Sequence, residues 1–90
     1  MPRYVVQRSF AEGLQMPVGT GGLELCRRVV ERNAVEGVTW LTSFVSEDGR
    51  RTFCVYDAPT PEAIRRTAAA NDLPVEEITR VSVLDPYFYE

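Results

Sequence analysis

Two β-prone runs in the middle of the chain restrict the fold more than any other feature. Residues 38–45 and 51–57 are rich in valine, threonine and aromatic side chains, which favour strands. Between them lies Glu47-Asp48-Gly49-Arg50, where Gly49 tolerates the positive φ of a tight turn. We therefore expect an antiparallel hairpin, around which the remaining elements have to be arranged.

The segment before the hairpin reads as a strand followed by a helix. Residues 3–10 are β-prone, and residues 11–22 are predicted as a loop because they contain four glycines and a proline. Gly37 is suited to end the helix that follows. Apolar side chains recur there at helical spacing, at Leu23, Cys26, Val30 and Ala34, with Val29 beside them.

The segment after the hairpin reads as a second helix and a last strand. Thr60-Pro61 has the residue types of an N-cap and a first helical position. The helix is expected to end at Asn71, and the last strand is expected over residues 78–84. Residues 85–90 form an aromatic tail that we expect to dock, on this chain or on a partner.

This order of elements predicts an α+β fold. Two strand-helix-strand halves joined by a hairpin give the ferredoxin-like βαββαβ arrangement, a four-stranded antiparallel sheet with both helices on one face. Ninety residues fit one domain, so residues 1–90 are predicted to form a single domain.

Alternation along the strands predicts which side chains share a face of the sheet. We expect a mainly aliphatic set beneath the helices, made of Leu41, Ser43, Val45, Phe53, Val55, Val81 and Val83. We expect an aromatic and mildly polar set, with Val6 beside it, on the open face. The predicted ligand-binding residues belong to this second set, and they are Tyr4, Arg8, Trp40, Thr42, Phe44, Thr52, Cys54 and Tyr56.

An open face of this kind needs a cover, because soluble monomers rarely expose a large apolar patch. We predict a homodimer of the dimeric α+β barrel type, in which two sheets face each other. The space between them either encloses a small ligand or is a dry interface, and the sequence leaves both readings open.

Several stretches together resemble a known bacterial family. They include Glu36-Gly37-Val38-Thr39-Trp40, Leu73-Pro74 and, above all, Phe53-Cys54-Val55-Tyr56-Asp57-Ala58-Pro59. The chain resembles the domain-of-unknown-function family 4242, also called the nickel-binding protein family. The resemblance implies a ferredoxin-like homodimer, and it raises nickel binding by histidines.

Nickel binding meets an obstacle, because the chain contains no histidine. The resemblance implies that Thr42 and Thr67 stand where relatives often carry His, and a hydroxyl is a poor ligand for Ni²⁺. We therefore predict no metal site and no cofactor. A weak nickel-binding protein remains an alternative, with Cys54 and carboxylates such as Asp57 as donors.

The two cysteines are interpreted as small buried side chains. Cys26 lies on the predicted inner stripe of its helix, whereas Cys54 is assigned to the open face, so no disulfide between them is expected. Neither cysteine belongs to a motif with metal-site spacing.

The leading hypothesis is a small dimeric binding or accessory protein, and the alternative is an enzyme. A cofactor-independent monooxygenase or cyclase would use the same cavity, with Arg8, Tyr56 or Asp57 as activating groups. The net charge of −3 and the absence of lysine argue against nucleic acid as a partner. We expect no membrane partner and a cytoplasmic location, since no signal peptide or spanning segment is visible.

Overall fold

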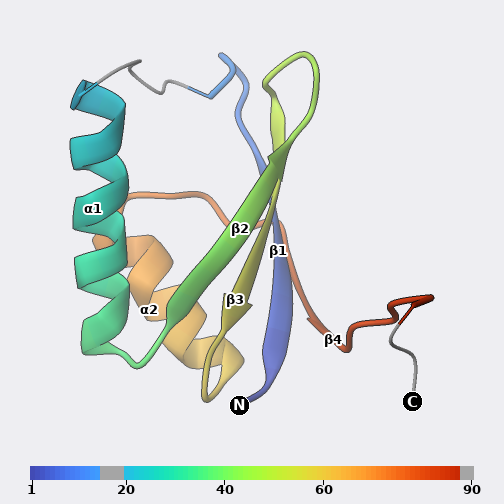
Figure 1. Cartoon of the computed structure of the whole chain (residues 1–90). Coiled ribbons are helices and arrows are strands. Elements are labelled where there is room, and N and C mark those ends of the chain that lie inside the picture. The colour runs from blue at the N-terminus through green and yellow to red at the C-terminus, as the bar shows by residue number, and fades with distance from the viewer. Residues whose placement is uncertain (15–19, 88–90) are drawn as a thin grey trace.

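The computed structural model describes residues 1–14 and 20–87. In chain order it contains β1 (Arg3–Ser9), α1 (Thr20–Val35), β2 (Thr39–Val45), β3 (Arg51–Asp57), α2 (Pro61–Ala70) and β4 (Glu77–Val81). The strands form one sheet in the order β2-β3-β1-β4, and every neighbouring pair is antiparallel. Both helices lie on the same side of this sheet (Figure 1). The predicted α+β, ferredoxin-like fold is thus confirmed.

Local capping and turn chemistry account for these elements. The side chain of Thr60 accepts a hydrogen bond from the Ala63 N–H at 3.2 Å, and Pro61 is the first residue of α2. Asn71 caps the other end of α2, as predicted. In the hairpin, Gly49 has φ 72°, a conformation that glycine adopts without strain.

The last strand is shorter than the predicted span of residues 78–84. Val81 at the end of β4 pairs with Arg3, the first residue of β1. Beyond this pair the neighbouring residue is Pro2, which has no N–H to donate to a ladder. Val83 and Leu84 therefore leave the sheet and are exposed. Tyr87 is exposed on the isolated chain, and residues 88–90 of the predicted docking tail lie outside the described residues.

The prediction of which sheet face lies beneath the helices is wrong for β1 and β3. Every second residue of these two strands is buried beneath the helices. All of these buried residues were predicted to lie on the open face. Phe53 and Val55, assigned to the covered face, are half-buried on the opposite side. The buried members are Tyr4, Val6, Arg8, Thr52, Cys54 and Tyr56.

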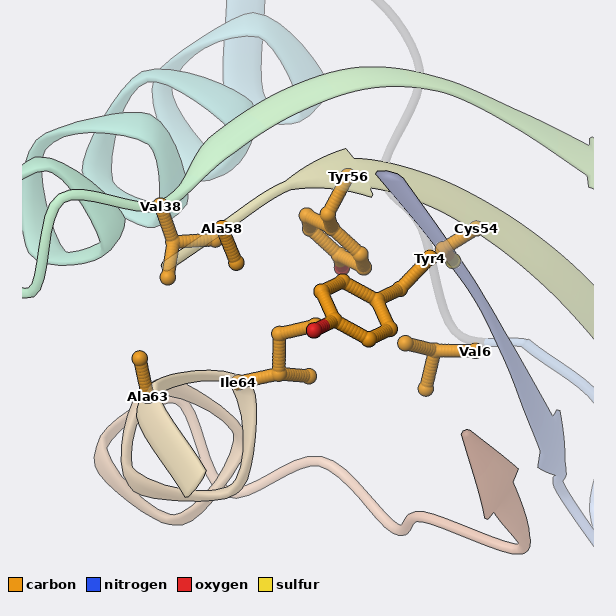
Figure 2. Close-up of a cluster of buried hydrophobic side chains, with 8 residues drawn as sticks. All are labelled: Tyr4, Val6, Val38, Cys54, Tyr56, Ala58, Ala63 and Ile64. Carbon is orange, nitrogen blue, oxygen red and sulfur yellow. The ribbon is translucent and has the colours of Figure 1, made fainter. Parts of the chain in front are cut away.

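Complementary sizes of side chains explain this orientation. The helix α2 presents mainly small buried residues to the sheet, among them Ala63 and Ala68. Large rings from the sheet fill the space that these small residues leave, so Tyr4 and Tyr56 point towards Ile64 of α2 (Figure 2). The aliphatic set that looked suited to the core would not complement such a helix.

In β2, the residues before and after a bulge do not keep the single alternation between faces that was predicted. A bulge between Trp40 and Thr42 shifts the register, so Trp40 pairs with Tyr56 while Thr42 pairs with Val55. Trp40 therefore faces the helices, whereas Thr42 lies on the open face as predicted. Leu41, predicted to be covered, is 42% exposed at the bulge.

The inner side of α1 also differs from the predicted stripe. Leu23 and Val30 are exposed, while Asn33 is almost fully buried and Cys26 is half-buried. The side-chain oxygen of Asn33 accepts a hydrogen bond from Asn71 Nδ2 at 3.1 Å, which links the two helices. Its side-chain nitrogen is buried and has no hydrogen-bond partner among the described residues, so Asn33 is only partly satisfied in this inward position.

We predict that Ile64→Ala lowers the free energy of unfolding by about 2–5 kcal/mol, since it removes a buried branched side chain from the centre of the core. Ile64 is only 1% exposed. The matched control is Val35→Ala on α1, where the side chain is 85% exposed and the expected change is below about 0.5 kcal/mol. Urea unfolding of both variants checks this, and equal losses would contradict the assignment of Ile64 to the core.

Candidate ligand-binding cavity

A cavity of about 350 Å³ lies between α1 and the helix-facing side of the sheet. Its helical wall includes Leu25, Cys26 and Val29. The sheet supplies the opposite wall, and the segments that follow β1 and α2 supply its edges. Most of the lining side chains are apolar, so the cavity has the character of a site for a small molecule.

The cavity brings together five of the eight predicted ligand-binding residues. Tyr4 belongs to the adjacent core cluster and is not among the lining residues. Thr42 and Phe44 lie on the open face, where their partners in β3 are Val55 and Phe53. The residues that line the cavity are Arg8, Trp40, Thr52, Cys54 and Tyr56. Their grouping was predicted correctly, but on the wrong side of the sheet.

Among the described residues that line the cavity, Arg8 is the one that carries a charge, and it is 2% exposed. Its Nη1 donates a hydrogen bond to the carbonyl oxygen of Pro74 at 3.0 Å, and its Nη2 donates to the Tyr56 hydroxyl at 3.1 Å. The guanidinium carbon also lies 5.9 Å from the centre of the Tyr56 ring. In the described part of the chain, no carboxylate pairs with this guanidinium.

Tyr56 keeps its proton at neutral pH. Burial raises the pKa of its hydroxyl above the ordinary value of 10.0, and the nearby positive charge of Arg8 opposes this shift without reversing it. The phenol accepts one hydrogen bond from Arg8, and the neighbouring Cys54 thiol also interacts with it and helps to keep its pKa raised.

The remaining polar groups of the sheet wall have partners among themselves. The Trp40 indole N–H donates to the Ser43 hydroxyl at 2.8 Å, which is possible because the bulge turns both side chains to the same side. The Cys54 thiol lies 3.8 Å from the Thr52 hydroxyl oxygen. Arg8 and Tyr56 are therefore the groups best placed to meet a polar atom of a ligand.

Residues of α1 and of the segment after β1 were missed as lining residues. Phe10 and Leu14 lie at the edge of the cavity, and Val29 lies on its helical wall. Cys26 and Cys54 both line it, although they were predicted to lie on opposite sides of the sheet. The small side chains of α2 could have indicated these residues in advance. Small side chains on the helix leave space for the aromatic strand residues to face inward, which places the cavity on the helix side of the sheet.

Of the three alternative activating groups named for an enzyme, Arg8 and Tyr56 lie together in the cavity, whereas Asp57 does not. Asp57 at the end of β3 forms an ion pair with Arg3 at 2.9 Å, and the hydrogen bond from Arg3 lowers the pKa of its carboxyl. Asp57 is not among the lining residues, whereas Arg8 and Tyr56 are. The geometry supports binding better than acid-base chemistry, which needs a group whose pKa lies near the working pH.

The donor set does not fit a nickel ion. Within residues 1–14 and 20–87, no group of three or more His, Cys, Asp or Glu side chains is placed to hold a metal. Thr67 is buried in α2, where its hydroxyl donates to the Ile64 carbonyl oxygen at 2.9 Å, while Thr42 lies on the open face. The two positions at which the resemblance implied histidines are thus on opposite sides of the sheet.

Comparison with known proteins assigns the family. A family model described as nickel responsive protein SCO4226-like matches residues 4–81. The chain belongs to this family. The broader part of the sequence resemblance, a nickel-related family with this fold, is therefore confirmed.

One solved structure supports the fold. The crystal structure of SCO4226 from Streptomyces coelicolor A3(2) superposes with a TM-score of 0.73, covering 92% of this chain and 99% of that chain. The two sequences are 14% identical over the match, so the likeness speaks for the fold alone. No curated protein matches the chain. In the described residues, no helix combines the length and apolarity that crossing a membrane requires.

The raised pKa of Tyr56 predicts a loss of stability at high pH. As the pH rises above about 10, the unfolded chain releases the phenolic proton that the folded chain retains, which favours unfolding. The stabilising contribution is thus fully present below about pH 10 and is lost as the pH approaches the folded pKa.

Urea unfolding at about pH 8 and about pH 11 checks this prediction. Between these two pH values, the free energy of unfolding is expected to fall less in Tyr56→Phe than in the unmodified chain. Equal falls would show that Tyr56 does not titrate in a buried site.

Proposed function

We propose that this member of the nickel-responsive family is a binding protein that holds a small, largely apolar molecule in the cavity between α1 and the sheet. The observation that carries the proposal is the cavity of about 350 Å³, into which five predicted ligand-binding residues converge. Ligand sites in proteins have this volume and this mainly apolar lining with a few polar groups.

The size of the cavity supports an occupant. The space is partly open to solvent, so an apolar occupant would displace water from the mainly apolar side chains that line it. In volume the space equals roughly twelve water molecules, enough for a ligand with an apolar body and a polar end.

The ligand is proposed to lie within each protomer and not between two sheets. Of the polar groups predicted to hold a ligand, Thr52 and Cys54 face the helices together with Arg8 and Tyr56, whereas Thr42 lies on the open face. Nickel binding by the described residues is not part of the proposal, because they offer no suitable donor set. The narrower label of family 4242 and a cytoplasmic location stay predictions from the sequence.

Filling the cavity is expected to abolish binding. We predict that Val29→Phe, on the helical wall, lowers the affinity for the neutral fluorescent probe N-phenyl-1-naphthylamine at least tenfold, since the ring occupies the space of the probe (about 1.4 kcal/mol per tenfold). The measurement is a fluorescence titration, with circular dichroism to check folding.

The matched control is Val30→Phe, the adjacent residue, which is 49% exposed on the outer side of α1. It is expected to bind the probe as the unmodified chain does. Absence of probe binding to the unmodified chain would refute the proposed function. Equal binding by all three proteins would place the probe elsewhere.

The open face of the sheet supports a homodimer as the second part of the proposal. Phe44 is 62% exposed there, and Phe53 and Val55 beside it are half-buried. A second copy of the chain would cover this surface, since two-fold homodimers are the commonest oligomers and aromatic residues are enriched at interfaces.

We predict that Phe44→Glu shifts the chain from dimer to monomer, because a carboxylate would be buried without a partner in the interface. Sedimentation velocity measures the change. The control is Leu23→Glu, which places the same charge at an exposed residue of α1 and is expected to leave the dimer intact. A monomeric unmodified chain would refute the dimer.

A further inference from the structure

We propose that the cavity selects a molecule with an apolar body and one carboxylate, which pairs with the guanidinium of Arg8. This inference rests on the proposed function and specifies the chemical class of its ligand. Arg8 carries its charge in a buried position, where its hydrogen-bond partners are neutral.

Three of the arginines nearer the surface pair with carboxylates, whereas the buried Arg8 pairs with none among the described residues. Arg3 pairs with Asp57, and Arg66 pairs with Glu36, both at 2.9 Å and both with side chains that are more than a third exposed. Arg8 is 2% exposed, and its two hydrogen-bond partners, a carbonyl oxygen and a phenol, are neutral. The need for a counter-charge is thus greatest where the described residues supply none.

The unused donors of Arg8 suit a carboxylate. A guanidinium has five N–H donors, and two of its nitrogens, Nη1 and Nη2, each make one hydrogen bond to the protein. A planar carboxylate can accept two parallel N–H bonds from such a group. The Tyr56 hydroxyl, which holds its proton, can add a third hydrogen bond to the same ligand oxygen.

A single negative charge fits better than a phosphate. Among the described residues that line the cavity, Arg8 is the one cationic side chain. A dianion would therefore find one counter-charge where two are needed to neutralise it. The apolar residues around this point, such as Leu25, Val29 and Leu73, suit a hydrocarbon or aromatic body.

Arg8 also has a structural contact, through which it ties the segment after α2 to β1 by its bond to Pro74. The experiment therefore has to separate loss of recognition from loss of structure. Two competitors of equal chain length, octanoate and 1-octanol, provide this separation because they differ in charge and share the apolar body.

The experiment measures displacement of N-phenyl-1-naphthylamine by octanoate and by 1-octanol from three proteins: the unmodified chain, Arg8→Met and Arg28→Met. Arg28 is exposed on α1 and serves as the matched control. In Arg8→Met, the affinity for octanoate is expected to fall at least tenfold, because the hydrogen bonds between the guanidinium and the carboxylate are lost. The affinity for 1-octanol is expected to change less than about threefold. Arg28→Met is expected to behave like the unmodified chain.

The outcomes separate the two proposals. Binding of the probe with equal losses of octanoate and 1-octanol in Arg8→Met would overturn the carboxylate inference and leave the binding function standing. Failure of the unmodified chain to bind any of the three compounds would overturn both.

A variant that fails to fold does not prevent a decision. In the unmodified chain alone, octanoate is expected to raise the thermal midpoint more than 1-octanol does at equal concentration, and the reverse order would overturn the inference. Arg8→Lys, which keeps the charge without the planar fork, is expected to retain part of the preference for octanoate.

Discussion

Antiparallel pairing between β1 and β3 determines which side chains lie beneath the helices. The register places Tyr4 opposite Tyr56, Val6 opposite Cys54 and Arg8 opposite Thr52. Because side chains alternate along a strand, all six point to the same face. One end of this row packs on α2 as the core, and the other end faces α1 across the cavity. The cavity is therefore a continuation of the core and not a separate surface feature.

The elements of the fold could be predicted because their signals are local. Thr60 and Pro61 begin α2 by hydrogen bonding and by a fixed φ, and Gly49 permits the hairpin, whatever packs around them. The choice of the covered face is not local, because both faces of β3 carry apolar side chains. It depends on the small residues of α2, and a strand pattern alone does not contain that information. The bulge at Trp40 adds a change of register that alternation cannot reveal.

Five of the eight residues predicted to bind a ligand share one cavity, but it lies on the helix-facing side of the sheet and not on the open face. Arg8, Trp40 and Tyr56 lie together in the structure, as the sequence interpretation expected. Pairing between neighbouring strands places them on one face of the sheet, whichever face the helices cover. The helical wall with Cys26 and Val29 could not be found, since the apolar stripe of α1 pointed to Leu23 and Val30 instead. In the observed orientation of α1, Asn33 is the buried residue, and its side-chain oxygen accepts a hydrogen bond from Asn71.

The bulge in β2 has a consequence for how copies of this chain meet. β2 is an edge of the sheet, and an exposed edge with free N–H and C=O groups invites another strand to continue the ladder. The irregularity between Trp40 and Thr42 interrupts the even row of such groups. The bulge thereby disfavours the addition of further strands at this edge of the sheet. It does not impede packing of the open face of one sheet on that of another. A single backbone irregularity thus favours closed assemblies over fibres.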